Sequence, residues 1–191
     1  MIHKLIMLML LSCFYLAYFA KQLSLKKQGI NTNRLAKGSK PKRTQLIELC
    51  LLFITYAAAV LQFLSVLLSA DFNWQIYRTA GSFLMFSGVA FFLLAIIAMR
   101  SNWRAGIDEA QKTDIVSTGI YRFSRNPAFV GFDLLYIGTA LACPNIFMIV
   151  FAAVAVTTLH LQILEEEKYL AKEFGGKYLL YKNKTARYIV F

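Results

Sequence analysis

Long stretches of uncharged, apolar residues dominate the pattern along this chain. A helix that crosses the hydrocarbon core of a bilayer, about 30 Å thick, needs about 20 such residues. Two stretches reach this length, Leu49 to Ala70 and Thr79 to Met99, and each predicts one membrane-spanning helix. Leu5 to Ala20 is shorter and predicts a short span.

A fourth apolar stretch, Pro127 to Leu164, contains one charged residue, Asp133, and is too long for a single span. As one helix it would be about 57 Å long at 1.5 Å per residue. Pro144-Asn145 lies near its middle, where a helix would break. The pattern therefore predicts a hairpin of two helices here. With the other three stretches, it predicts an all-α, polytopic membrane protein with five transmembrane helices.

The first stretch has an alternative interpretation as a signal peptide, because Lys4 precedes an apolar run. However, Lys21, Lys26 and Lys27 follow this run closely. Cationic segments resist translocation. Their charge favours a membrane span over a signal peptide.

Composition agrees with a membrane protein, since 58% of the residues are hydrophobic and 16% are charged, unlike a soluble domain. Of the 21 lysines and arginines, eight lie between Lys21 and Glu48, five between Arg100 and Asn126, and six after Glu165. Because cytosolic loops are rich in Lys and Arg, we expect the N-terminus outside and a helical C-terminal tail in the cytosol. The net charge of +11 indicates attraction to anionic membrane lipids, and no motif for a nucleic-acid partner accompanies it.

The chain offers few of the residues from which common cofactor and metal sites are built. None of its ten glycines forms a Gly-rich dinucleotide or phosphate loop after a strand. His3 and His160 fall at opposite membrane faces in this topology, and the three cysteines have no paired spacing. We therefore predict neither a metal site nor a His-based catalytic triad.

Polar residues instead gather at the cytosolic ends of the fourth and fifth spans: Arg122, Arg125, Asn126, His160, Gln162 and Glu165 to Glu167. Three consecutive glutamates fan over about 200° of a helix, so they cannot all face one pocket. Gln162 and Glu166 are four residues apart and share a helical face. Periodicity therefore predicts at most one inward carboxylate.

Turn-forming residues divide the loop and the tail. Residues 113–121 predict an extended segment that turns at Gly119. Gly175-Gly176 can end a fifth helix that continues past the membrane. We expect a single domain over residues 1–191, with three spans in 1–99 and a loop, the hairpin and the tail in 100–191.

Two motifs resemble the signature of the isoprenylcysteine carboxyl methyltransferase and phospholipid methyltransferase families. The first motif is Gly119-Ile120-Tyr121-Arg122-Phe123-Ser124-Arg125-Asn126-Pro127-Ala128-Phe129-Val130-Gly131. The second is Glu166-Glu167-Lys168-Tyr169-Leu170, followed by Phe174-Gly175, Tyr178, Tyr181 and Arg187. The likeness covers roughly Trp103 to the C-terminus.

The resemblance implies an integral, multi-pass membrane methyltransferase, with residues 100–191 as its catalytic part. Such an enzyme would use S-adenosylmethionine to methylate the carboxylate of a lipid-borne or prenylated, isoprenylcysteine-like acceptor. The active site would face the cytosol, at the plasma membrane of a prokaryote or the endoplasmic reticulum of a eukaryote. The cofactor pocket would be lined by Thr113, Asp114, Ile115, Val116, Tyr121, Asn126, Pro127, Ala128, Phe129 and Glu166. Candidate catalytic residues are Glu166, Asn126 and Arg125, and candidate substrate-binding residues are Gln162, His160 and Gly138.

A lipid chain would reach such a site sideways between spans, since exposing each CH₂ group to water costs about 0.8 kcal/mol. Four small residues would leave room for the lipid chain in one interpretation and would serve close helix packing in the other: Gly131, Gly138, Ala152 and Ala153.

The sequence departs from the family pattern at two of these positions. Asn126 stands where the family more often has His, and Asn cannot titrate. Gln162 stands where the eukaryotic carboxyl methyltransferases have an Arg that is linked to substrate. The alternatives are a phospholipid or amine N-methyltransferase, or a non-enzymatic scaffold or carrier that would not bind S-adenosylmethionine. A related reductase family has a similar C-terminal region but generally more spans.

Overall fold

The computed structural model describes residues 2–30, 35–37, 40–69, 75–103 and 114–189. The helices are α1 (Ile2–Lys27), α2 (Lys42–Leu68), α3 (Gln75–Met99), η1 (Arg100–Asn102), η2 (Gly119–Arg122), α4 (Pro127–Ala142), α5 (Ile146–Phe174) and α6 (Gly176–Lys184). No strand occurs within these described ranges. The all-α prediction is therefore confirmed.

Among the described residues, four helices are long and apolar enough to cross a bilayer: α1, α2, α3 together with η1, and α5. The fifth apolar helix, α4, has 16 residues, and its length of about 24 Å is less than the thickness of a typical hydrocarbon core. The chain is therefore an integral, multi-pass membrane protein. The count of five spans stays a prediction.

The predicted break in the fourth apolar stretch is confirmed, because α4 ends at Ala142 and α5 begins at Ile146. Asn145 caps the new helix, since its Oδ1 accepts a hydrogen bond of 2.8 Å from the Met148 amide. This bond satisfies one of the amides that a helix start leaves free.

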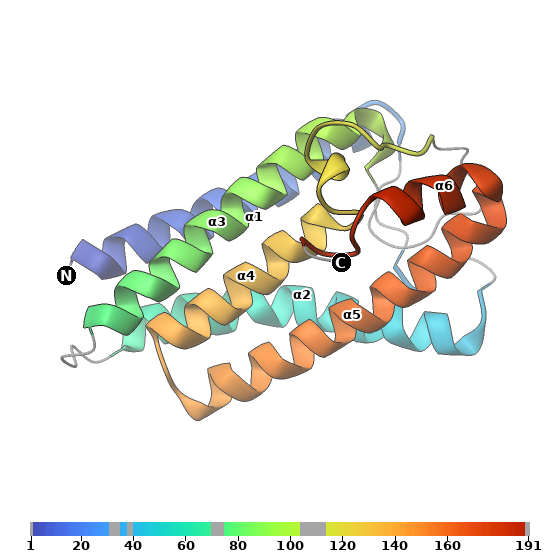
Figure 1. Cartoon of the computed structure of the whole chain (residues 1–191). Coiled ribbons are helices and arrows are strands. Elements are labelled where there is room, and N and C mark those ends of the chain that lie inside the picture. Colours follow the sequence, from blue (N-terminus) through green and yellow to red (C-terminus); the bar gives the residue numbers. More distant parts are fainter. Residues whose placement is uncertain (1, 31–34, 38–39, 70–74, 104–113, 190–191) are drawn as a thin grey trace.

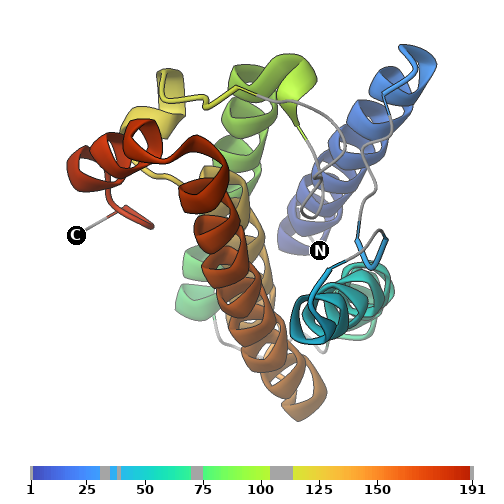
Figure 2. The same cartoon turned by 90° about the vertical axis from the view of Figure 1, so that its right-hand side faces the viewer.

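The five apolar helices follow one another around a ring in the order α1, α3, α4, α5 and α2, as the roughly end-on view of Figure 2 shows. Each helix contacts the next, and α2 closes the ring against α1. Met7, Leu11 and Phe14 of α1 are fully buried. The first apolar stretch is thus part of the bundle core, which favours the membrane-span interpretation.

The closest helix contact joins α3 to α4. A Cβ atom added at Gly138 would lie 2.7 Å from the carbonyl oxygen of Gly81, and one added at Gly131 would lie 2.8 Å from that of Gly88. The pairs face each other in reverse chain order, so the two helices are antiparallel. Gly138 therefore serves close helix packing, and the expected room for a substrate chain beside it is filled by α3.

A buried polar network ties three helices of the ring together. The Tyr15 hydroxyl of α1 donates a hydrogen bond of 2.6 Å to Gln62 Oε1 of α2, and Gln62 Nε2 donates one of 2.8 Å to Thr139 Oγ1 of α4. Gln62 and Thr139 are fully buried. Because an unpaired polar group there would be costly, the network fixes how these helices meet.

The tail turns back toward the bundle after α5. Gly175, with φ of 51°, ends α5 as predicted, and α6 then leaves the end of α5 at a steep angle, as Figure 1 and Figure 2 together show. The chain then brings Arg187 against Glu167 and Tyr188 against His160 of α5. The turn expected at Gly119 is also present, since this residue has φ of 61° and begins η2.

Candidate active site

Three consecutive glutamates near the C-terminal end of α5 have different partners. Glu165 accepts a hydrogen bond of 2.9 Å from the Thr44 hydroxyl of α2. Glu166 accepts one of 3.0 Å from Gln162 Nε2, whereas Glu167 pairs with two arginines. Successive helical positions differ by 100°. The expectation that the three carboxylates face different surroundings is confirmed, as is the shared face of Gln162 and Glu166.

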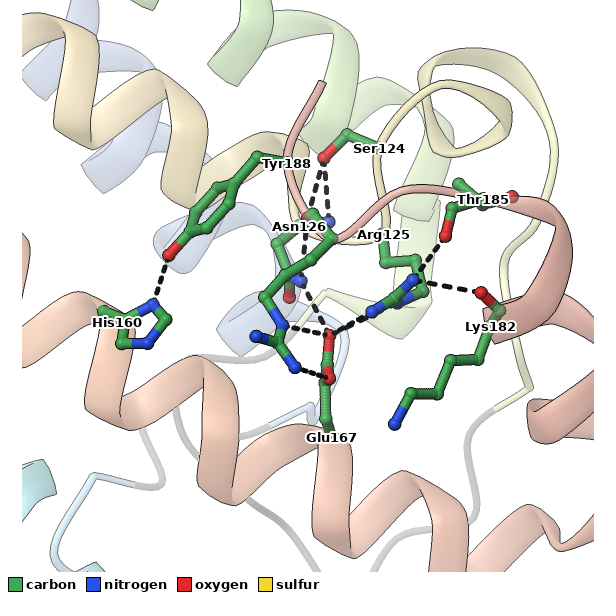
Figure 3. Close-up of polar contacts among 9 residues, drawn as sticks. Ser124, Arg125, Asn126, His160, Glu167, Lys182, Thr185 and Tyr188 are labelled. Atoms are coloured by element: carbon green, nitrogen blue, oxygen red, sulfur yellow. Dashed lines mark hydrogen bonds and ion pairs between the residues drawn. The ribbon is translucent and has the colours of Figure 1, made fainter. Parts of the chain in front are cut away.

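Glu167 is the centre of a mostly buried ion-pair network (Figure 3). Its Oε1 lies 2.9 Å from Arg125 Nη2 and its Oε2 lies 3.0 Å from Arg187 Nη2. The side chains of Arg125 and Glu167 are 7% and 6% exposed. The same carboxylate raises the pKa of the Arg187 guanidinium. The network therefore holds the segment after α6 against the start of α4.

Arg125 and Asn126 use further polar atoms on the same segment. Arg125 Nη1 donates hydrogen bonds to the backbone carbonyls of Lys182, at 3.1 Å, and of Thr185. Asn126 Nδ2 donates one of 3.1 Å to the Arg187 carbonyl. Both side chains therefore hold the tail in place. Both also line the cavity described next, and the catalytic roles that the resemblance implied for them stay a prediction.

A cavity, here called the loop cavity, lies between η2, the start of α4, the end of α5 and α6. Its wall includes most of the residues predicted to bind the cofactor: Asp114, Ile115, Val116, Tyr121, Asn126, Ala128, Phe129 and Glu166. Pro127 is buried in the first turn of α4 and does not line the cavity. Thr113 lies outside the described residues. The fold thus brings three separate segments together, and their cofactor role stays a prediction.

Several aromatic residues of the loop cavity had no predicted role. Trp103 follows η1, Tyr169 comes from α5, and Tyr178 and Tyr181 come from α6. The second motif contains Tyr169, Tyr178 and Tyr181, and the last two also share a helical face because they are three residues apart. The orientation of α6 relative to the bundle decides which residues that helical face contacts.

The aromatic wall is closed by a hydrogen bond of 2.7 Å from the Tyr181 hydroxyl to the Tyr121 carbonyl. Tyr121 and Tyr178 are buried. Burial raises the pKa of the Tyr121 phenol and raises that of Tyr178 to about 12. Both phenols are therefore neutral at physiological pH. Burial also raises the pKa of the Glu166 carboxyl to about 7, so this carboxyl gains and loses its proton near neutral pH.

A second, smaller cavity, here called the bundle cavity, lies within the ring of helices. Its own wall is mostly apolar and comprises Tyr18, Leu35, Leu51, Thr55, Phe132 and Leu159. Four further residues line both cavities: Trp103, Ala128, Phe129 and Glu166. Glu166 therefore stands where the loop cavity meets an apolar space inside the bundle.

The wall residue Leu35 is held in place by a buried contact that no sequence pattern indicated. Glu48 of α2 is fully buried. Its Oε2 accepts hydrogen bonds of 2.9 Å from the Ala36 amide and 2.7 Å from Lys40 Nζ. These bonds fix the chain after α1 against the bundle cavity.

The residues predicted to bind substrate line neither cavity. His160 Nδ1 lies 2.6 Å from the Tyr188 hydroxyl, and the two rings stack at 22° (Figure 3). Gln162 is fully buried and adjoins the cavities through its bond to Glu166. His160 thus contacts the tail, and Gln162 orients a cavity carboxylate.

The chemistry of the loop cavity suits a small cationic ligand. Carboxylates come from Asp114 and Glu166, and aromatic rings come from Tyr121, Phe129 and Trp103. Carboxylates attract a positive charge directly, and aromatic faces attract it through their quadrupole. The adjoining bundle cavity offers mainly apolar contacts.

Comparison with known families decides the relationship of this chain. A model of the family described as phospholipid methyltransferase matches residues 53–177, more than half of the chain. The chain belongs to the phospholipid methyltransferase family. The matched range includes α3, α4, α5 and most residues of both cavities.

Two curated relatives resemble part of this family member. The protein-S-isoprenylcysteine O-methyltransferase of Saccharomyces cerevisiae is 38% identical over 78 residues, which are 40% of this chain and 33% of the relative. The protein of the same name from Schizosaccharomyces pombe is 33% identical over 72 residues, which are 37% of this chain and 30% of the relative. The matches therefore span about a third of the length of these relatives.

Proposed function

We propose that this protein transfers a methyl group from S-adenosylmethionine to the carboxylate of a lipid-anchored, isoprenylcysteine-like acceptor. The observation that carries the proposal is the meeting of two unlike cavities at Glu166. A water-soluble, cationic donor suits the loop cavity, and a lipid-borne acceptor suits the apolar bundle cavity. The names of the two yeast relatives support an isoprenylcysteine as the acceptor.

The loop cavity would hold the donor by charge and aromatic contact. When bound, S-adenosylmethionine supplies an electrophilic methyl group on a sulfonium. Tyr121 and Phe129 offer aromatic faces to that positive charge. Asp114 and Glu166 offer carboxylates to its other polar groups. Gln162 keeps Glu166 in one orientation through their hydrogen bond of 3.0 Å.

At the acceptor, the protein would position the carboxylate and exclude water. A carboxylate is already deprotonated at neutral pH, so no general base is required. Phe132 and Leu159 give the bundle cavity an apolar wall. Opposite charges cancel during this transfer, and a site with little water favours such a change. Orientation of the two reactants contributes on the order of 7 kcal/mol in favourable cases.

The proposal places the site at the cytosolic face, because the basic residues concentrate on that side of the predicted topology. The acceptor chain would enter the bundle cavity sideways from the bilayer. α2 is the N-terminal helix that lies beside α5, and Leu51 and Thr55 on it line the bundle cavity. We therefore propose that the lipid chain of the acceptor passes beside α2.

The test is a methyl transfer assay with the purified protein in nanodiscs. Its donor is S-adenosylmethionine labelled in the methyl group, and its acceptor is an S-prenylated N-acetylcysteine. A carboxyl methyl ester releases labelled methanol in alkali, whereas an N-methyl amine does not. We expect alkali-labile product that depends on the prenyl group. No binding of S-adenosylmethionine in calorimetry would overturn methyl transfer and favour a scaffold or carrier.

Phospholipid N-methylation is a second candidate, favoured by the description of the family. A protonated amine must lose a proton before it can accept a methyl group. Glu166, which lines both cavities, is the candidate base. Glu167 is not a candidate base, because its carboxylate forms ion pairs with two arginines. Alkali-stable label on phosphatidylethanolamine would select this alternative.

A further inference from the structure

Helix α6 has two faces of different character. On one face, Tyr178 is 1% exposed and lines the loop cavity together with Tyr181. On the other, Leu179 and Leu180 are 50% and 66% exposed. The helical spacing of 100° per residue puts the exposed Lys177 and Lys184 next to Leu180. We call these four outward residues, Lys177, Leu179, Leu180 and Lys184, the α6 surface.

The path of the tail places this surface near the membrane boundary. The apolar part of α5 ends at Leu164. Arg187 pairs with Glu167, about 4.5 Å further along α5, and Tyr188 pairs with His160, which precedes Leu164. Lys184 is three residues from Arg187, and therefore within about 10 Å of it. The end of α6 thus lies at the layer of lipid headgroups, which is about 5 to 8 Å thick on each side.

We infer that the α6 surface binds anionic phospholipid headgroups of the adjacent leaflet and that this contact strengthens binding in the loop cavity. The two lysines complement the charge of the headgroups, and the two leucines enter the boundary between headgroups and acyl chains. The partner is the lipid surface itself. The second half of the inference rests on the proposed binding of S-adenosylmethionine.

The coupling follows from the contacts that hold α6. The Tyr181 hydroxyl bonds to the Tyr121 carbonyl at 2.7 Å, and Arg125 bonds to the Lys182 carbonyl at 3.1 Å. Both contacts lie on the inner side of the helix, beside the loop cavity. Lipid and donor therefore favour the same docked position of α6. Two ligands that favour one state strengthen each other's binding by the same factor.

Lipid contact can be measured without any ligand. A spin label on Asn183→Cys, in a background without Cys13, Cys50 and Cys143, reports from the outward side of α6. A label on Glu173→Cys near the end of α5 is the control. In nanodiscs with phosphatidylglycerol, we expect the Asn183 label to favour collision with oxygen over a water-soluble nickel chelate, and the Glu173 label to favour the chelate. Equal access to the chelate at both positions would overturn the lipid contact.

Coupling is measured as the dissociation constant of S-adenosylmethionine in nanodiscs with and without phosphatidylglycerol. Each lysine near an anionic surface contributes about a five-fold change in association. The double variant Lys177→Gln/Lys184→Gln should therefore lose most of the lipid dependence. The control variant Lys26→Gln/Lys172→Gln removes the same charge from exposed positions outside α6. This control should keep the lipid dependence.

The control pair also separates docking from simple attraction of a cationic donor to an anionic membrane, which would affect all forms alike. Equal lipid dependence in both double variants would overturn the coupling. If S-adenosylmethionine binds in neither lipid, the proposed function fails, and the spin labels still decide whether α6 contacts lipid.

Discussion

Gln162 donates a hydrogen bond of 3.0 Å from its Nε2 to Oε1 of Glu166, one helical turn further along α5. Gln162 is fully buried, so this bond fixes the carboxylate that lines both the loop cavity and the bundle cavity. Glu165 and Glu167 precede and follow it in the chain but have other partners. The neighbouring glutamates therefore serve as controls for one another.

Replacing Glu166 with Ala is expected to weaken S-adenosylmethionine binding by roughly ten-fold to over a hundred-fold. A hydrogen bond to a charged group contributes about 1.5 to 3 kcal/mol. Glu165→Ala should have a smaller effect, since Glu165 contacts Thr44 and Lys168. Titration calorimetry measures both variants. A greater loss for Glu165 would show that the wrong face of α5 has been assigned to the donor.

Removal of the Glu167 carboxylate is expected to destabilise the fold by about 3 to 5 kcal/mol, because Glu167→Ala leaves the buried Arg125 without its charge partner. Thermal unfolding in detergent measures the change, and limited proteolysis should show earlier cleavage of the tail. Glu173→Ala, at an exposed position of the same helix, is the control. An unchanged unfolding temperature for Glu167→Ala would contradict a structural role of the network.

Gly138→Leu is expected to reduce the amount of folded protein, because even a Cβ atom there lies 2.7 Å from the Gly81 carbonyl oxygen. Overpacking costs about 1 to 3 kcal/mol, and a larger side chain can cost more. Gly176→Ala is the control, since nothing lies within 4 Å of its added Cβ. Thermal unfolding compares the two. A fully stable Gly138→Leu protein that has lost only acceptor use would restore the substrate role of this position.

Filling the bundle cavity should impair acceptor use and spare donor binding. Leu51→Trp enlarges a side chain that lines the bundle cavity and not the loop cavity. We expect the KM for a prenylated acceptor to rise about ten-fold or more. Leu46→Trp, at a position of α2 that is 62% exposed, is the matched control. Equal effects of both variants would argue against the bundle cavity as the acceptor site.

Acceptor length tests the sideways route from the bilayer. Each CH₂ group buried contributes about 0.8 kcal/mol, so use of the acceptor should fall steeply as its chain shortens. Initial rates with a series of S-alkyl acceptors measure this dependence. A short, water-soluble acceptor methylated as efficiently as the prenylated one would exclude membrane access as the route that matters.

The sequence by itself determined where the long helices lie and where two of them stop. It did not determine every end, since α1 continues to Lys27 and α2 begins at Lys42, beyond the predicted apolar stretches. Apolar runs set the long helices because burial in lipid depends mainly on local composition. The break near Asn145 and the stop at Gly175 follow from backbone preferences of the residues themselves. The shared face of Gln162 and Glu166 follows from helical spacing alone.

Only the tertiary structure decided which polar groups the site can use. Arg125 and Glu167 are 42 residues apart, and Tyr181 reaches a carbonyl 60 residues away. Gly138 likewise gained its packing role from Gly81 on another helix. Such contacts depend on how separate helices pack, and helical periodicity relates only residues of one helix. The sequence could therefore predict Glu166 as a neighbour of Gln162. Only the packing of the helices into a ring places that carboxylate between two cavities.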